Sequence, residues 1–339
     1  MNVLITGVSG WLGRRLLELL REGHCAQRKL GKLNIRCLLL KNSDVEFARH
    51  LVKKFNVSVI SGDLKERNTL KNAVEGIDVV FHLAGVTWAH RVKDYFQINT
   101  LGTENLITVS VQKKVKRFIY ISSESVSGVK RDYSGKAIES DKPSPYCSYA
   151  FSKHQAEMAV NRIARSEGIE TVILRPSVFY GPLMPADQVR FFRMIKNGRP
   201  VIFGNGKNLR NMVYIDNVVE AVLLSAQVKE AAGNTYFIAD NEPHTTYEIY
   251  KMISEEIKGK DLRPVYIPDI FCDACYFLDK SLQYFGLHSS LIHVAAFMNK
   301  NVVCSIDKAK NELGYNPAVR LREGIKKSLK WCRDNNIKL

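Results

Sequence analysis

Short apolar runs and amphipathic helical patterns alternate along the first half of the chain. Each apolar run is β-branched or leucine-rich, and each is followed by a stretch whose apolar residues recur at helical spacing. This alternation predicts an α/β protein with a doubly wound parallel sheet, because parallel strands need crossover connections. The expected strands are residues 2–6, 35–40, 57–61, 79–84, 118–122 and 171–175, and the expected helices are 11–21, 45–54, 69–74, 96–112 and 149–166.

The pattern becomes irregular after residue 175. Loops rich in glycine, proline and asparagine separate shorter elements, and residues 265–297 are dense in aromatic side chains and leucine. We expect one domain over residues 1–175, whose sheet also receives segments from about 205–240, and a smaller mixed α/β lobe formed mainly by 176–339. We expect the aromatic side chains of 265–297 to pack inward as the core of that lobe; an apolar ligand surface is the alternative. A cleft between the two parts is the natural place for a substrate.

The composition is that of an ordinary globular protein, with 45% hydrophobic and 25% charged residues. The net charge of +16 is large, but the basic residues are spread over many segments without interleaved aromatic side chains, so we expect no nucleic-acid partner. The chain starts with a strand-like run and holds no long uncharged apolar stretch, which predicts a cytoplasmic protein without a signal peptide or membrane segment. Seven cysteines are scattered, and Cys272 and Cys275 lack a second pair or close histidines, so we expect no metal site.

The first apolar run leads directly into Thr6-Gly7-x-x-Gly10-x-x-Gly13 and then into a helical pattern. Glycine permits the tight turn, leaves room for a pyrophosphate, and lets the helix pack closely on the strand. The unpaired N–H groups at the start of that helix attract phosphate oxygens. The loop therefore predicts dinucleotide binding.

The end of the second expected strand bears on the choice of dinucleotide. An acid that binds the adenosine ribose is usual about 20 residues beyond the glycines, whereas this chain offers Lys41, Asn42 and Ser43. A cation and a hydroxyl suit a 2′-phosphate, so NADP is favoured over NAD; a solvated strand end is the alternative. Asp63 is the nearest acid at a strand end and is placed to bind the adenine amino group.

The stretch Tyr149-Ala-Phe-Ser-Lys153 contains the candidate general acid/base and a nearby cation. A spacing of four places the phenol and the ammonium on one helix face, where the cation is expected to lower the tyrosine pKa toward that of a usable general acid or base. Ser122 and Ser123 follow the fifth strand and can reach the same edge of the sheet.

Ordered motifs along nearly the whole chain resemble the extended short-chain dehydrogenase/reductase superfamily, in its NAD-dependent epimerase/dehydratase group, with features similar to 3β-hydroxysteroid dehydrogenases. The motifs are TGVSGWLG (6–13), GDL (62–64), FHLAG (81–85), NTLGTENL (99–106), YISSESVSG (120–128), YAFSK (149–153), LRPSVFYGP (174–182), MVYIDNVVEA (212–221) and LGYNP (313–317). The resemblance implies a Rossmann-type sheet that binds NAD or NADP, and a homodimer formed by the Tyr149 helix and the helix before the fifth strand.

The resemblance also implies roles for individual residues. Tyr149 would be the general acid/base, Lys153 would bind the nicotinamide ribose and tune Tyr149, and Ser123 would hold the substrate oxygen. The cofactor would contact Thr6, Gly7, Gly10, Trp11, Leu12, Gly13, Lys41, Asn42, Ser43, Asp63, Leu64, Leu83, Ala84, Gly85, Asn99, Ile121, Ser122, Tyr149, Lys153, Pro176, Ser177 and Val178. Thr87, Ser123, Glu124 and Arg210 would contact the substrate.

The substrate class stays open between two alternatives. Arg210 stands where nucleotide-sugar enzymes of this group carry an arginine for the diphosphate, which favours a nucleotide-activated sugar and 4-epimerase or 4-ketoreductase chemistry. Val178 replaces the asparagine usual in such enzymes, and the aromatic 265–297 region resembles hydroxysteroid dehydrogenases, which favours an apolar alcohol. Glu124 lacks the partner pattern of a dehydratase. A noncatalytic NADP-binding regulatory protein is a third alternative, disfavoured by the intact Ser123, Tyr149 and Lys153.

Overall fold

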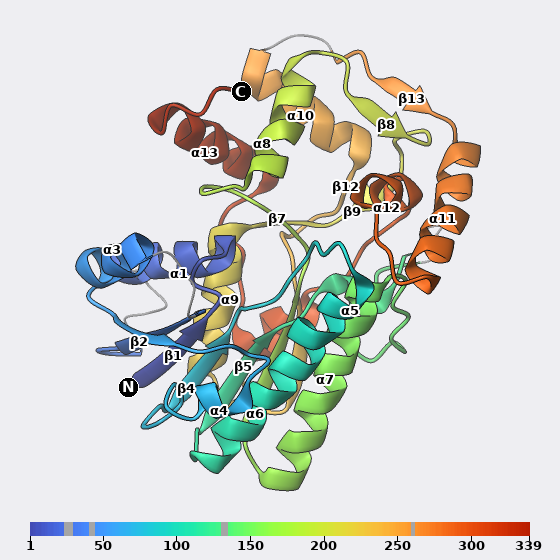
Figure 1. Cartoon of the computed structure of the whole chain (residues 1–339). Coiled ribbons are helices and arrows are strands. Elements are labelled where there is room, and N and C mark those ends of the chain that lie inside the picture. The colour runs from blue at the N-terminus through green and yellow to red at the C-terminus, as the bar shows by residue number, and fades with distance from the viewer. Residues whose placement is uncertain (24–29, 41–44, 130–134, 259–261) are drawn as a thin grey trace.

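The structure is a computed structural model and describes residues 1–23, 30–40, 45–129, 135–258 and 262–339. Its centre is a seven-stranded parallel sheet in the order β3-β2-β1-β4-β5-β6-β11 (Figure 1). The strands are β1 (Asn2–Thr6), β2 (Asn34–Leu39), β3 (Ser58–Ser61), β4 (Val79–His82), β5 (Arg117–Ile121), β6 (Glu170–Pro176) and β11 (Asn234–Ile238). This arrangement confirms the predicted doubly wound fold.

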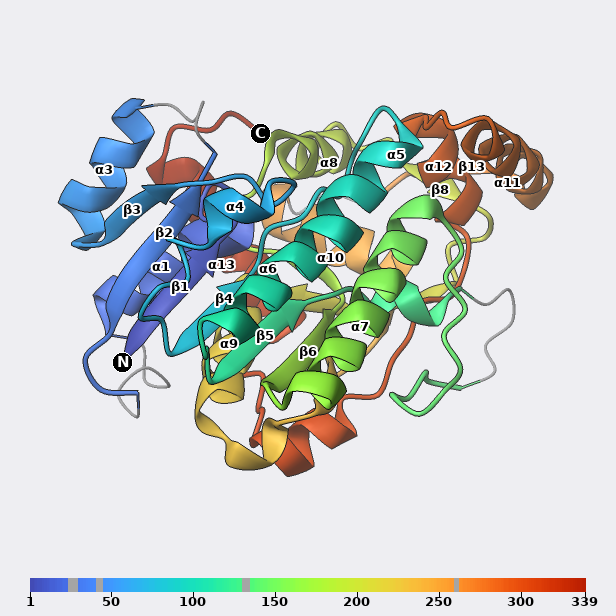
Figure 2. The same cartoon turned by 60° about the horizontal axis from the view of Figure 1, so that its bottom comes forward.

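Helices cover both faces of the sheet, so its strands are apolar on both sides. In β1, Val3 and Ile5 pack on α1 (Trp11–Glu22), α3 (Val45–Phe55) and α9 (Ile215–Gln227), while Leu4 packs on the opposite face. That opposite face carries α4 (Arg67–Leu70), α6 (Gly102–Gln112) and α7 (Ser148–Glu167). Figure 2 shows α6 and α7 side by side across the sheet.

Two predicted helices differ from those observed. The expected helix 96–112 starts earlier, with α5 (Val92–Tyr95), and is interrupted by a π-helical turn (Phe96–Leu101) before α6. The expected helix 69–74 is only the single turn α4, followed by turns up to Gly76. Such a short segment provides few backbone hydrogen bonds, so tertiary contacts decide its shape.

Segments from the second half of the chain complete the sheet. Strand β11 pairs with β6 in parallel, and α9 packs on α1. The π-helical segment Ala309–Leu313 also contacts α9 and β11, and its Ala309 and Leu313 belong to the same apolar core as β1. The amino-acid pattern did not single out this last segment.

The remaining elements form the smaller lobe. Its core lies between α8 (Ala186–Lys196), α10 (Thr246–Lys258) and α13 (Leu321–Asp334), and includes Phe192, Ile253 and Leu329. The other elements are α11 (Asp269–Tyr284), α12 (Ser290–Phe297) and the paired strands β7 (Val178–Tyr180) with β10 (Met212–Tyr214), β8 (Val201–Phe203) with β13 (Val265–Ile267), and β9 (Leu209–Arg210) with β12 (His244–Thr245). None of the described helices is both long and apolar enough to cross a bilayer.

The prediction that the aromatic side chains of 265–297 pack inward is wrong for most of them. Phe271, Phe277 and Tyr284 of α11 are exposed, and only Cys272 and Asp279 of that helix are buried. The reason is that α11 packs chiefly on α12, so one narrow side of the helix finds cover and its other apolar positions face outward.

Candidate active site

The glycine loop lies at the carboxyl edge of the sheet, between the ends of β1 and β4, where the strand order reverses. Gly7 has φ +76°, and a Cβ there would lie 2.6 Å from the Ala84 nitrogen. A Cβ on Gly13 would collide with the Gly7 carbonyl, whereas one on Gly10 would meet only that carbonyl, at 3.2 Å. Because no side chain caps the start of α1, its N–H groups are available to phosphate oxygens. The loop therefore fits the pyrophosphate of a dinucleotide.

Thr6 acts through a buried hydrogen-bond chain rather than through a free side chain. Its hydroxyl accepts from the Ala84 N–H (3.2 Å) and bonds His82 Nδ1 (2.8 Å), and His82 Nε2 bonds the Thr103 hydroxyl (2.8 Å). That hydroxyl donates to the Asn99 carbonyl, so the proton on His82 lies on Nε2. Burial and the nearby Lys153 lower the pKa of His82 to about 3, which keeps it neutral. Motif reasoning missed His82, although it stands within FHLAG.

Asn99, in the π-helical turn, holds the loop after β4 against α7. Its side chain accepts from the Val86 N–H (2.8 Å) and donates to the Val86 carbonyl and the Ser152 hydroxyl, both at 3.0 Å. A Cβ on Gly85 would lie 3.1 Å from Asn99 Oδ1 and 3.5 Å from Lys153 Nζ. The loop with Leu83, Ala84 and Gly85 thus lies beside Lys153, where a cofactor ribose is expected.

The structure brings Ser123, Tyr149 and Lys153 together. Lys153 is buried, and its Nζ donates to the carbonyl of Ile121 at the end of β5 (2.6 Å). Ser123 accepts from both the N–H and the hydroxyl of Ser125 (3.2 and 2.9 Å), so its own hydroxyl proton points to a third partner. A side-chain hydrogen bond joins Ser123 to Tyr149, which is half-buried.

The pKa of Tyr149 lies above its ordinary value, contrary to the expected lowering by Lys153. Burial raises it to about 12, with a smaller opposing effect from the Ser123 hydrogen bond. Burial also lowers the pKa of Lys153 to about 7, so its positive charge is itself weakened. Phenol and ammonium stand four residues apart on α7, on one face of the helix as predicted, but desolvation is the largest effect on the pKa of each.

Glu124, Ser177 and Arg210 form a polar group beside these residues. Burial raises the pKa of Glu124 to about 8, although the hydrogen bond from Ser177 (2.5 Å) and the charge of Arg210 oppose the rise. Arg210 donates from Nη2 to the Phe297 carbonyl (2.7 Å), while its buried Nε has no partner among the described residues. Tyr146 interacts electrostatically with Arg210, Glu124 and Tyr149, and sequence reasoning missed it despite its position three residues before Tyr149.

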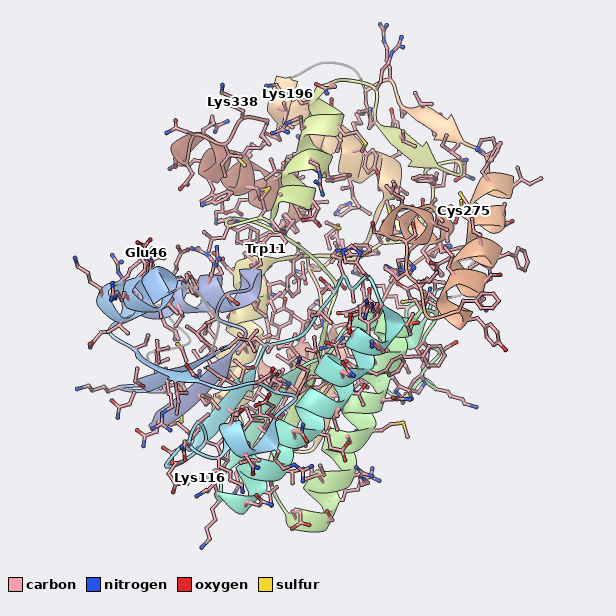
Figure 3. All side chains as sticks on the ribbon, in the orientation of Figure 1. Trp11, Glu46, Lys116, Lys196, Cys275 and Lys338 are labelled. Atoms are coloured by element: carbon pink, nitrogen blue, oxygen red, sulfur yellow. The ribbon has the colours of Figure 1, made fainter. Side chains whose placement is uncertain are left out.

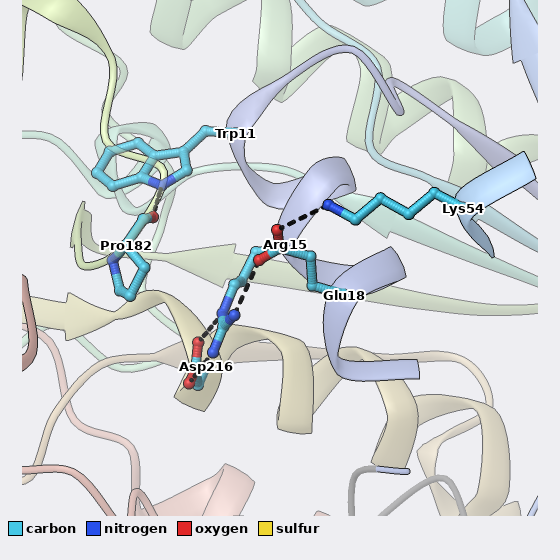
Figure 4. A network of polar contacts seen from close by, with 6 residues as sticks. All are labelled: Trp11, Arg15, Glu18, Lys54, Pro182 and Asp216. Atoms are coloured by element: carbon cyan, nitrogen blue, oxygen red, sulfur yellow. Dashed lines mark hydrogen bonds and ion pairs between the residues drawn. The ribbon is translucent and has the colours of Figure 1, made fainter. Parts of the chain in front are cut away.

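Other predicted residues occupy structural positions near the site. Trp11 donates to the Pro182 carbonyl (2.5 Å), and Arg15 binds Asp216 of α9 through two hydrogen bonds (Figure 4).

The remaining predicted residues vary in burial. Leu12 and Leu64 are buried in the apolar cores, and Asp63 Oδ1 accepts from the Lys65 N–H (2.9 Å). Ser122 is buried at the end of β5, Pro176 ends β6, and Thr87 and Val178 are exposed. Lys41, Asn42 and Ser43 lie outside the described residues.

A separate surface pocket lies at the opposite edge of the sheet. It is lined by the amino ends of β4, β5 and β6 and by Asp78 and Lys116, away from every predicted catalytic residue. Lys116 projects there, whereas Lys196 and Lys338 lie at the other end of the molecule (Figure 3). The three lysines labelled in Figure 3 therefore lie at opposite ends of the molecule and form no common basic surface.

Comparison with known proteins decides the family. The model described as the NAD dependent epimerase/dehydratase family matches residues 3–239. The chain belongs to this family. It is therefore an enzyme of the extended short-chain dehydrogenase/reductase superfamily that depends on a nicotinamide dinucleotide, as the motifs predicted.

Relatives of this family member have diverse descriptions. An uncharacterised protein of Sinorhizobium fredii, y4nL, is 36% identical over 98% of this chain and 95% of its own length. A 3β-hydroxysteroid dehydrogenase/decarboxylase of Arabidopsis thaliana is 27% identical over 96% of this chain and 78% of its own. The crystal structure of the UDP-glucuronic acid 4-epimerase from Bacillus cereus, with UDP-glucuronic acid and NAD, has a TM-score of 0.76 at 22% identity and covers 99% of this chain and 100% of that one. This last likeness shows a shared fold.

Proposed function

We propose that the enzyme interconverts a secondary alcohol and a ketone on a nucleotide-activated sugar, as a 4-epimerase or a 4-ketoreductase. The observation that carries the proposal is the buried Nε of Arg210, a charged donor beside Glu124 and Tyr146 that has no partner within the described part of the chain. An unpaired buried donor is costly, and a planar guanidinium matches phosphate oxygens. The diphosphate of a sugar nucleotide supplies such oxygens.

The residues at the sheet edge fit a nicotinamide dinucleotide. Gly7, Gly10 and Gly13 would hold the pyrophosphate, and Lys153 would hold the nicotinamide ribose, with Asn99 fixing the adjacent loop through Val86. When bound, the nicotinamide ring exchanges a hydride with the substrate carbon and, when oxidised, adds a positive charge that favours the Tyr149 phenolate. The preference for NADP over NAD stays a prediction that rests on Lys41–Ser43, and it is checked by comparing the dissociation constants of the two cofactors.

The proton of the substrate hydroxyl moves directly between the substrate oxygen and Tyr149. When substrate binds, the Ser123 hydroxyl donates a hydrogen bond to the substrate oxygen and so orients it, while keeping its proton. In oxidation, the Tyr149 phenolate takes the proton of the substrate hydroxyl while the C–H electron pair leaves as hydride; in reduction, the Tyr149 phenol returns the proton to the new alkoxide. Epimerisation requires the hydride to return to the opposite face of the ketone, and a ketoreductase completes only the reduction.

The test compares Arg210→Ala with Arg190→Ala, an exposed arginine of α8. We expect Arg210→Ala to raise the KM for a UDP- or dTDP-sugar by roughly 10–100-fold, because a hydrogen bond to a charged group is lost, and Arg190→Ala to leave the KM unchanged. An equal KM in both variants, or no turnover of any sugar nucleotide by the wild type, would contradict the proposal.

A second candidate is an apolar secondary alcohol. The exposed apolar side chains of α11 and α12 favour it, since a lobe that displays Phe277 and Leu291 can receive a hydrophobic molecule. In that case a steroid-like alcohol is oxidised, and Arg210→Ala leaves its KM unchanged.

We infer in addition that the enzyme is a homodimer. Phe151 and Met158 of α7 are about half exposed or more, at 47% and 59%, and Leu101 in the preceding π-helical turn is exposed by 46%. Apolar positions on neighbouring helices suit the expected four-helix contact with a second copy. Sedimentation of wild type and Met158→Glu tests this inference, with the variant expected to shift toward monomer.

A further inference from the structure

Asp279, His288 and His293 form a compact cluster, the His–Asp cluster, in the smaller lobe. Asp279 lies on α11, His293 lies on α12, and His288 lies between the two helices. Each offers one ligand atom, and these atoms all lie within 4.8 Å of one another. Asp279 is fully buried, and both histidines are partly buried.

Several polar atoms of this cluster have no hydrogen-bond partner in the described part of the chain. Asp279 Oδ2 accepts from His293 Nδ1 (2.9 Å) and from Gln283 Nε2 (2.7 Å). Its Oδ1 has none among the described residues, and neither ring nitrogen of His288 has one. Because nearly all buried polar atoms in proteins are hydrogen-bonded, three unpartnered atoms at one place point to a ligand.

The donor set indicates which ligand. Two imidazoles and one carboxylate are the ligands typical of Zn²⁺ sites that keep one position open, and they are a poor set for the oxygen-preferring Ca²⁺ or Mg²⁺. Cys147 interacts electrostatically with His293, so a sulfur atom lies near the cluster. We propose that the His–Asp cluster binds one Zn²⁺ ion.

The position of the cluster indicates what the ion does. Gln283 donates to Asp279 and accepts from the N–H and hydroxyl of Ser148, at 2.7 and 2.6 Å, beside Tyr149 at the start of α7. The Tyr95 ring contacts both His288 and Tyr149, with ring centroids 5.7 and 6.1 Å apart. A Zn²⁺ ion therefore fastens α11 and α12 to each other and to the start of the catalytic helix.

This site differs from the one that the sequence analysis considered and set aside. The spacing Asp279-x8-His288-x4-His293 follows directly on the pair Cys272 and Cys275, yet neither cysteine belongs to the cluster. The three ligands belong to no short motif, because a helix end and a loop bring them together. The inference is independent of the substrate.

The first experiment measures zinc on the full-length wild type. Protein treated with a chelator and then dialysed against Zn²⁺ is expected to hold one equivalent, and its melting temperature is expected to rise because the ion binds only the folded state. Bound Co²⁺ is expected to show the visible absorption of a four-coordinate ion. A stoichiometry far below one, with no thermal shift, would overturn the proposal.

The second experiment compares His288→Ala with His50→Ala, an exposed histidine of α3. Removal of one ligand is expected to weaken zinc binding by roughly 100-fold or more, whereas His50→Ala retains wild-type affinity. Since His288 is only partly buried, the variant is expected to fold, and an unchanged cofactor affinity verifies this. Full zinc binding by His288→Ala, or equal loss in His50→Ala, would refute the assignment. Asp279→Asn provides an independent check through its Co²⁺ spectrum.

Discussion

The catalytic edge of the sheet and the α11–α12 pair differ in which side chains they bury: the first buries charged groups, and the second exposes apolar ones. At the sheet edge, charged groups are buried: Arg175 and Glu157 are 5% and 3% exposed and share two hydrogen bonds. On α11 and α12, Phe277 and Leu291 are 69% and 83% exposed. Polarity alone therefore does not decide burial in this enzyme; the number of elements that surround a position does.

The largest expected contrast between the two regions concerns tyrosine. Tyr149→Phe removes the proton-transfer group and is expected to lower kcat by roughly 10²–10⁴-fold. Tyr284→Phe makes the same chemical change on exposed α11 and is expected to leave kcat unchanged. Steady-state rates of both variants check this, and a Tyr149→Phe enzyme of wild-type activity would remove Tyr149 from the mechanism.

Removal of a buried charge should be the next largest effect. Glu157→Gln leaves the Arg175 guanidinium buried without a counter-charge and is expected to lower the free energy of unfolding by roughly 3–5 kcal/mol. Glu167→Gln, exposed on the same helix, is expected to change it by less than about 0.5 kcal/mol. Urea unfolding of both variants gives the comparison, and equal values would show that burial is not the deciding factor.

Glu124 should make the stability of the sheet edge depend on pH. Its pKa is raised from 4.5 to about 8, so the folded state binds the proton more tightly than the unfolded chain. The stabilising contribution is complete below pH 4.5 and is lost as pH rises toward about 8. Glu124→Gln, which does not titrate, is therefore expected to gain stability relative to wild type across this range. A difference in melting temperature that stays constant with pH would contradict the pKa assignment.

The smallest effect is expected on the exposed face itself. Phe277→Ser should change the free energy of unfolding by less than about 0.5 kcal/mol, whereas Phe118→Ala in the fully buried β5 should cost about 3–5 kcal/mol. Chemical denaturation measures both. A large loss from Phe277→Ser would break the comparison, because it would mean that another surface covers α11 in solution.

Much of the sheet follows from the sequence pattern because its central strands β1, β4 and β5 are buried on both faces. Residues 2–6 were predicted as a strand and form β1, and the expected helix 149–166 is α7 with one more residue at each end. The α11 helix has the same apolar character, but its surroundings depend on which elements lie nearby, and the local sequence does not encode that. The inward packing predicted for its aromatic side chains failed for this reason.

The candidate site likewise contains some features that the sequence predicts and others that it does not. Motif spacing brought Ser123, Tyr149 and Lys153 together correctly, because a strand end and one helix turn position them. The direction of the Tyr149 pKa shift was predicted wrongly, since desolvation depends on distant elements such as α5, which brings Tyr95 against the phenol. His82 was missed because its partners Thr6 and Thr103 stand far from it in the sequence, and Tyr146 because its interaction with Arg210 depends on the tertiary fold.

The return of the chain to its own sheet limits how this enzyme can evolve. Strand β11, helix α9 and the segment Ala309–Leu313 belong to the second half of the sequence, yet they complete the first half's core. A gene fragment that ended at residue 175 would encode a sheet with an open edge and an uncovered α1. An exchange of everything after residue 175 therefore also replaces part of the sheet's own core, so the incoming segments have to fit α1 and β6.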